Sequence, residues 1–415
     1  MVILSEIIER AMTRKYLFTL YVFLNISCAL YFGVLGMLGG DFKYEYPADP
    51  ELLLLSLLIV LLTFWIVQRV IFVIFENIPV KTTINLNNSF ILDWLVFAIV
   101  IIGLFSSIFF SVGVLGASKD VAEDAPKLIF YFNSFFQPSL FVLIYLFYRY
   151  DSTRFLYYIN FILYIILILV SGQTGQILLL FCLYLIRKRN ALNFFQLCIF
   201  TLFGIGLYPF VRIIKDAIVQ SVNAGSNLIE TVLTAISNID MDIYFSYLFI
   251  TLERFQSVSN MHYLIQNGER LSALFDLTGS TYSFFSLYWL MSAFLRMFGV
   301  DLSSITSAQD FTAVSINGVS TWSSQIGVLG YIYFYGIYSA IIFVSIMIVL
   351  FFCIRMSKLL NKNNSITNLT WFISLLLICH GWFIPFYNYA QALLIFVGLV
   401  LTLNAFKVKH KAHGS

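Results

Sequence analysis

The chain has 415 residues and a formal net charge of +3; 60% of its residues are hydrophobic, 18% are aromatic and only 11% are charged. With a mean hydropathy of +0.90, this composition excludes an ordinary soluble globular protein, and the lack of Lys/Arg-rich blocks argues against nucleic acid as a partner. The apolar runs instead predict an all-α polytopic membrane protein, because several reach the roughly 20 residues that a bilayer-spanning helix needs.

The apolar runs predict about ten membrane spans. Seven are expected at about residues 16–38, 52–75, 94–116, 128–148, 155–171, 175–186 and 191–211, and three at about 323–353, 369–386 and 389–406. The fifth and sixth are short, but basic residues flank both ends of the pair, which favours a hairpin that returns to its starting side. Its turn, "SGQTGQ", is then expected to be sheltered inside the protein near the far face.

Basic residues orient the chain. One set of connections carries most of the lysines and arginines, whereas the loops 39–51 and 117–127 carry more acids than bases. The positive-inside rule makes the basic side cytoplasmic, so both termini are expected there, as an even number of spans requires. The expected domains are residues 1–211 with spans one to seven, 212–322 as a periplasmic segment, and 323–415 with spans eight to ten and a cytoplasmic tail.

The outer segment, 212–322, is not an ordinary water-soluble domain. Its runs "MDIYFSYLFITL" and "YSFFSLYWLMSAFLRMF" are apolar and aromatic, which favours helices that lie on the outer interface or dip into it. The alternative makes both runs crossings and gives twelve spans with unchanged termini. The sequence leaves both arrangements open.

The basic residues of the outer segment are the main site candidates. Each of the five lies beside or within apolar sequence: Arg212, Lys215, Arg254, Arg270 and Arg296. The positive-inside rule does not explain basic residues on the outer face of a membrane protein. Basic residues near a membrane usually have an anionic partner. One candidate partner is a lipid-linked phosphate or pyrophosphate, which the planar arginine fork binds bidentately. The other is the protein's own acids, Asp216, Glu253, Glu269 and Asp301.

Arg254 is the foremost of these cations. It follows the apolar run "IYFSYLFI" and precedes "FQSVSNMH", a polar stretch of the composition expected at the mouth of a cavity. Glu253 and His262 share this segment and are candidate bases, although His262 also fits a satisfied surface imidazole. Arg212 and Lys215 are one helical turn apart at the outer end of the seventh span, a spacing that suits a pyrophosphate.

No metal or cofactor is expected. The five cysteines lie in apolar segments without a CxxC or a Cys/His cluster, and buried inert thiols are their expected state. The sequence has no dense acidic cluster for a divalent metal. It also lacks HExxH, DxD, Walker and GxSxG patterns.

The whole chain resembles bacterial O-antigen polymerases of the Wzy type, within the group of integral-membrane polysaccharide polymerases and ligases. The likeness is in the expected spans, the cytoplasmic termini and the one dominant outer segment. The turn "SGQTGQ" is similar to a Ser/Gly-containing turn of that group, with Gln173 and Gln176 where an arginine is frequent. The run "INGVSTWSSQIGVLGY" is similar to the ligases' pattern of His, Asn, nine residues and G-x-x-G. Asn317 and both glycines match, but Ile316 replaces the histidine, which favours polymerase over ligase.

The resemblance implies a GT-C-like, metal-independent glycosyltransferase of the bacterial inner membrane, with its active site facing the periplasm. Such an enzyme transfers the growing glycan from undecaprenyl pyrophosphate onto a new lipid-linked repeat unit. The implied partners are this lipid-linked oligosaccharide, the bilayer, a chain-length regulator and a flippase. External arginines would neutralise the leaving pyrophosphate. Asn317 is carried over as a substrate-binding residue, and the candidate bases are Glu253, His262 and Asp301.

The main alternative is a lipid-linked oligosaccharide flippase, a transporter of similar length and hydrophobicity. Flippases usually distribute their loops evenly and place charges inside the spans. This chain instead has one outer segment of about 110 residues and apolar runs almost free of central charge. A membrane scaffold or another sugar-modifying transferase is a third class.

Overall fold

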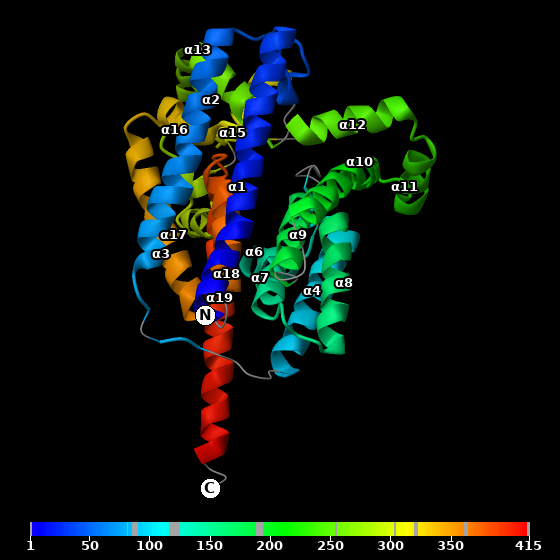
Figure 1. Ribbon diagram of the computed structural model, residues 1–415, viewed down its shortest axis with the longest axis vertical. Helices are drawn as coiled ribbons and strands as arrows, with labels where there is room; N and C mark the ends of the chain where they lie inside the picture. The colour runs from blue at the N-terminus through cyan, green and yellow to red at the C-terminus, as the bar shows by residue number, and fades with distance from the viewer. Residues whose placement is uncertain are drawn as a thin grey trace.

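The computed structural model describes residues 2–80, 82–84, 90–115, 125–187, 194–253, 255–302, 304–318, 323–360 and 364–412. It is almost wholly helical (Figure 1). Within these residues the one sheet is a short antiparallel ribbon, in which β1 (Met37–Leu38) pairs with β2 (Tyr46–Pro47). The predicted all-α class is confirmed.

The elements follow one another in chain order. The first half contains α1 (Val2–Leu35), the 3₁₀ turn η1 (Gly40–Phe42), α2 (Pro50–Trp65), the π-helical η2 (Ile66–Ile71), α3 (Phe72–Asn77), α4 (Phe90–Phe110), α6 (Lys127–Phe136), α7 (Pro138–Tyr148), α8 (Phe155–Val170), α9 (Gly175–Arg187) and α10 (Phe194–Ala224). The second half contains α11 (Leu228–Ser237), α12 (Met241–Glu253), α13 (Val258–Asp276), η3 (Phe284–Leu287), α14 (Trp289–Met297), α15 (Ala308–Asn317), α16 (Gly327–Tyr335), α17 (Tyr338–Leu359), α18 (Ser365–Ile373), the π-helical η4 (Ser374–Ile378) and α19 (Phe383–Ala412).

Helices long enough to cross a bilayer occur throughout the chain. In the part that the structure describes, seven are long and apolar enough: Thr13–Leu35, Pro50–Asn77, Phe90–Phe110, Lys127–Tyr148, Phe195–Ala224, Tyr338–Leu359 and Phe383–Ala405. The shorter apolar helices at the remaining expected spans are Phe155–Val170, Gly175–Arg187 and Ser365–Ile378. A multi-pass membrane protein is therefore supported, and the number of crossings stays a prediction.

Three predicted spans contain breaks, and in the run 369–386 the break lies at residues 379–382, between η4 and α19. The run 128–148 is divided into α6 and α7 at Gln137, which adopts a left-handed φ of 48° before Pro138. A proline disfavours the helical conformation in the residue that precedes it and cannot donate the helical hydrogen bond. The run 323–353 is divided into α16 and α17 at Gly336, whose φ of 48° is accessible to glycine at little cost.

The turn between α8 and α9 is sheltered, as the sequence predicts. Ser171 and Thr174 are buried, and Gly172 takes a left-handed φ of 69°. The carbonyl of Ser171 accepts a hydrogen bond from the Leu115 amide at 2.9 Å, and the hydroxyl of Tyr208 donates to Thr174 at 3.0 Å. Segments beyond α4 and on α10 thus supply hydrogen bonds to a turn in an apolar environment, while the Ser171 hydroxyl has no partner among the described residues.

The seventh apolar helix is longer than the sequence predicts. The seventh apolar run was expected to end at residue 211, but α10 continues to Ala224 with Pro209 inside it. α11 and α12 then fold back, and Figure 1 shows α12 above α10, extending to the side from the upper part of α1 and nearly perpendicular to it. α12 has 13 residues and α14 has nine. Both are well short of the roughly 20 residues of a crossing, which favours the interfacial arrangement.

The helix bundle has two chemically distinct ends. We call the end that contains Arg14, Glu76, Asp93 and Arg149 the inner end; α1 begins there, and the N and C labels of Figure 1 lie toward it. The outer end is formed by the α1–α2 connection (residues 36–49), the C-terminal half of α10, and α12, α13 and α15. Its polar groups surround the cavity described next.

Candidate functional site

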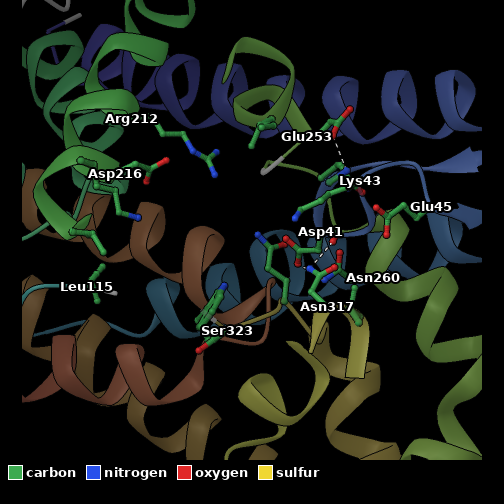
Figure 2. A pocket seen from close by; sticks show the side chains of 18 of the residues that line it. Asp41, Lys43, Glu45, Leu115, Arg212, Asp216, Glu253, Asn260, Asn317 and Ser323 are labelled. Atoms are coloured by element: carbon green, nitrogen blue, oxygen red, sulfur yellow. Dashed lines mark hydrogen bonds between the residues drawn. The ribbon is translucent and has the colours of Figure 1, made fainter. Parts of the chain in front are cut away.

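A cavity of about 720 Å³ lies at the outer end. One wall of the cavity is formed by α10, and the opposite wall is formed by the α1–α2 connection (Figure 2). The ends of α12, α13 and α15 and residues 323–325 form the remainder. The polar and charged residues that line it are Asp41, Lys43, Glu45, Arg212, Lys215, Asp216, Asn223, Glu253, Gln256, Asn260, Asn317, Ser323 and Gln325. Segments more than 280 residues apart in the chain thus form one site.

The α10 wall carries the predicted cation pair. Arg212 and Lys215 both line the cavity, and Figure 2 shows the Arg212 guanidinium extending into it. They lie within α10 rather than at its outer end, because the helix continues for three further turns. Asp216 follows them and accepts a hydrogen bond from the Tyr247 hydroxyl at 3.0 Å, which packs α12 against α10.

Lys43 is a third cation at the cavity, and sequence reasoning missed it. It follows η1 with a left-handed φ of 49°, and its side chain is exposed. Figure 2 shows it pointing into the cavity from the side opposite Arg212. The acidic excess of loop 39–51 indicates only that the loop is external. A single lysine among acids on an outer loop is the sequence feature that points to Lys43.

Asp41 is held by hydrogen bonds on the face opposite α10. Its Oδ2 accepts hydrogen bonds from Asn260 Nδ2 at 3.0 Å and from Ser324 Oγ at 2.8 Å. Its backbone carbonyl accepts a third from Asn317 Nδ2 at 3.0 Å. The predicted substrate-binding residue Asn317 therefore lines the cavity and also fixes η1. No motif or spacing in the sequence singles out Asp41.

Glu253 lies at the cavity, but both of its carboxylate oxygens are engaged. Oε2 accepts a hydrogen bond from the Gly40 amide at 2.6 Å, and Oε1 accepts one from the Tyr44 hydroxyl. Burial raises the pKa of Glu253, while these two hydrogen bonds act in the opposite direction. Burial is also the main cause of the raised pKa of Tyr44. Glu253 thus anchors the α1–α2 connection to α12, an arrangement that suits a positioning group better than a base.

The approach of this connection to α12 requires glycine. A Cβ added to Gly39 would lie 2.4 Å from the Phe32 ring and 3.0 Å from the Glu253 carboxyl carbon. Gly40 has a φ of 70°, and a Cβ there would lie 3.0 Å from the Gln256 amide nitrogen. Side chains at either position would displace the backbone that Glu253 binds.

Four of the predicted site residues lie outside the cavity lining: Arg270, Arg296, His262 and Asp301. Arg270 on α13 and Arg296 on α14 are exposed elsewhere on the outer segment. His262 is fully buried in α13, where its Nε2 accepts a hydrogen bond from the Asp49 amide at 3.0 Å. Burial lowers the pKa of His262, so the neutral ring is favoured. His262 therefore joins α13 to the start of α2. Its ring is buried rather than at the surface, and its Nδ1 has no hydrogen-bond partner among the described residues.

Arg254 lies outside the described residues, so its role stays a prediction. Asp301 is exposed and does not line the cavity. Within the chain segments that the structure describes, no three His, Cys, Asp or Glu side chains come together in a metal-binding arrangement.

A smaller cavity of about 220 Å³ adjoins the first on its inner side. Arg212, Lys215 and Gln325 line both cavities. The other groups that line the inner cavity are mostly aromatic or apolar: Tyr21, Tyr208, Phe255, Leu376 and His380. Thr174, Gly175 and Thr251 complete its lining. The two cations thus lie between a polar outer space and an aromatic inner space, an arrangement that suits an amphiphile with an anionic group between its polar and apolar parts.

No protein-family model, curated protein or solved structure matches this chain. The residues of the cavity therefore carry the functional argument.

Proposed function

We propose that the protein is an oligosaccharide repeat-unit polymerase with a GT-C-like fold in the bacterial inner membrane. It transfers the growing glycan from undecaprenyl pyrophosphate onto a new lipid-linked repeat unit at the periplasmic face, alongside a flippase and a chain-length regulator. One observation carries the proposal: Arg212, Lys215 and Lys43 line a single polar cavity at the outer end, and Arg212 and Lys215 also line the aromatic cavity that adjoins it.

The chemistry of the leaving group explains why cations are needed there. When the glycosidic bond to pyrophosphate breaks, negative charge develops on the departing oxygen. Fixed cations beside that oxygen stabilise the transition state, and they act more strongly among apolar helices than in water. Arginine adds a planar pair of donors that matches two phosphate oxygens.

The position of the cavity favours transfer over transport. A flippase needs a site that both faces reach in turn, and such sites usually lie near the bilayer midplane. This cavity is lined by the α1–α2 connection and by Leu115, which follows the end of α4. Both segments belong to one end of the bundle, so the cavity fits a reaction at a single face.

A deletion strain tests the proposal. Loss of a polymerase should leave single repeat units on lipopolysaccharide, and the wild-type gene on a plasmid should restore the full ladder on a gel. A ladder that persists in the deletion strain would contradict the proposal. Complete loss of repeat units would indicate a flippase instead.

A further inference from the structure

The cavity contains four carboxylates in its described lining, and they are held in different ways. Both oxygens of Glu253 accept hydrogen bonds, and Asp216 accepts one from Tyr247 on the cation-bearing wall. Glu45 is exposed on the loop. Asp41 is half-buried and is fixed through Oδ2 by Asn260 and Ser324. Among the described residues, the hydrogen bonds to this carboxylate reach only Oδ2, which leaves Oδ1 for a ligand in the cavity.

The surroundings of Asp41 suit a sugar. Asn260 and Asn317 lie beside Asp41, and Ser323 and the half-buried Trp382 also line the cavity. Amides and hydroxyls both donate and accept hydrogen bonds, as sugar hydroxyls require of their partners. An indole ring offers an apolar face on which the C–H surface of a sugar can pack. Figure 2 shows Asn260 and Asn317 beside Asp41, with Arg212 across the cavity.

From this arrangement we infer that the face containing Asp41 is the acceptor-sugar subsite, and that Asp41 is the base that takes the proton of the attacking hydroxyl. The inference rests on the proposed function and divides the cavity into a donor side and an acceptor side. The α10 wall binds the donor's pyrophosphate, and the opposite face binds the terminal sugar of the incoming repeat unit. This division places the nucleophile and the leaving group on opposite sides of the reacting carbon.

The step balances with the groups present. The acceptor oxygen forms a bond to the anomeric carbon of the donor sugar, and the bond between that carbon and the phosphate oxygen breaks. The phosphate oxygen keeps the electron pair, and its charge is neutralised by Arg212 and Lys215. The hydroxyl proton moves to Asp41 Oδ1.

The deciding variant is Asp41→Asn. Its amide oxygen still accepts the hydrogen bonds of Asn260 and Ser324, so the loop stays in place, but it cannot take a proton. We expect turnover to fall about 10²–10⁴-fold, the usual contribution of a general base, with little change in KM for the acceptor. The assay uses the purified protein in vesicles, with lipid-linked repeat units extracted from the deletion strain. Asp41→Glu should retain part of the turnover, and Glu51→Gln, an exposed acid of α2, should be unchanged.

A second measurement separates chemistry from structure. In Asp41→Ala, added formate should enter the vacated space, accept the proton and restore turnover severalfold, which a purely structural role would not allow. Wild-type turnover in Asp41→Asn would overturn the inference while the proposed function stands. If the wild-type protein does not elongate these repeat units, the proposed function fails and the inference fails with it.

Discussion

The inner and outer ends of the bundle contain the same kinds of charged residue but use them differently. At the inner end, Asp93 is fully buried and lies 3.7 Å from Arg149 and 3.5 Å from Arg154. Arg14 likewise contacts Glu76 at 2.8 Å. These charges compensate one another within the protein, which lowers the cost of placing them beside apolar helices.

At the outer end, Arg212, Lys215 and Lys43 line a cavity of about 720 Å³. The carboxylates there are held by hydrogen-bond donors such as the Gly40 amide, Asn260 and Ser324. Cations that line a space of this size can receive an anionic ligand. The comparison teaches that the setting of a charge, more than its type, separates a structural role from a functional one.

The largest expected effect concerns which side of the membrane each end faces. A tag inserted at Gly40, on the outer end, and a tag after Ser415 should be accessible from opposite sides. The positive-inside rule places the basic end in the cytoplasm. Protease or thiol-reagent access in intact and permeabilised cells measures this. If both tags are reached only after permeabilisation, the assignment of the outer end to the periplasm is wrong.

The next effect is on stability. Asp93→Ala removes the carboxylate between two arginines, and breaking a buried pair typically costs about 3–5 kcal/mol. The loss in free energy of unfolding should lie near the lower end of this range, because the Arg154 side chain is 32% exposed. The purified variant should melt at a lower temperature, with Asp151→Ala, an exposed acid nearby, as the matched control. Shortened glycans from Asp93→Ala at matched protein level would instead give the inner end a functional role.

A comparable effect on rate is expected at the outer end. Arg212→Ala removes a cation from the leaving group, and losing about 3–4 kcal/mol of transition-state stabilisation slows transfer roughly 10²–10³-fold. Arg212→Lys should be less impaired, because it keeps the charge but loses the bidentate fork. The same result is predicted for Arg254, which lies outside the described residues.

The readout for Arg212 is the glycan ladder at matched membrane-protein level on an immunoblot. Arg270→Ala is the matched control, because this arginine is exposed on α13 outside the cavity. Its effect should be mild. A full ladder from Arg212→Ala would remove the pyrophosphate role from the α10 wall.

The smallest expected effect is a pH dependence of stability at Glu253. Burial raises its pKa in the folded protein, so between its ordinary pKa and the raised one the folded state binds more protons than the unfolded state. Stability should therefore be greatest below the ordinary pKa and fall as pH rises through the raised one. Melting temperatures measured across this window should show that slope in the wild type and a weaker one in Glu253→Gln. An identical slope in both proteins would assign it to other groups.

The sequence alone determined the helical class of the protein and part of its candidate site. Long apolar runs predicted the helical class and the positions of the apolar helices, because span length and hydropathy are local properties. The sheltered turn between α8 and α9 followed from basic residues at both ends of a short pair. Arg212 and Lys215 were predicted together because a spacing of three residues places side chains on one helix face.

The tertiary structure decided which polar residues face the cavity. Asp41 and Lys43 join Arg212 from about 170 residues away in the chain, and no local pattern encodes that approach. Arg270, Arg296 and His262 looked comparable to Arg212 in sequence, yet two are exposed elsewhere and the third is buried against Asp49. A polar side chain becomes a ligand group only where the fold leaves space beside it, and that space is formed by segments that meet only after the helices have packed.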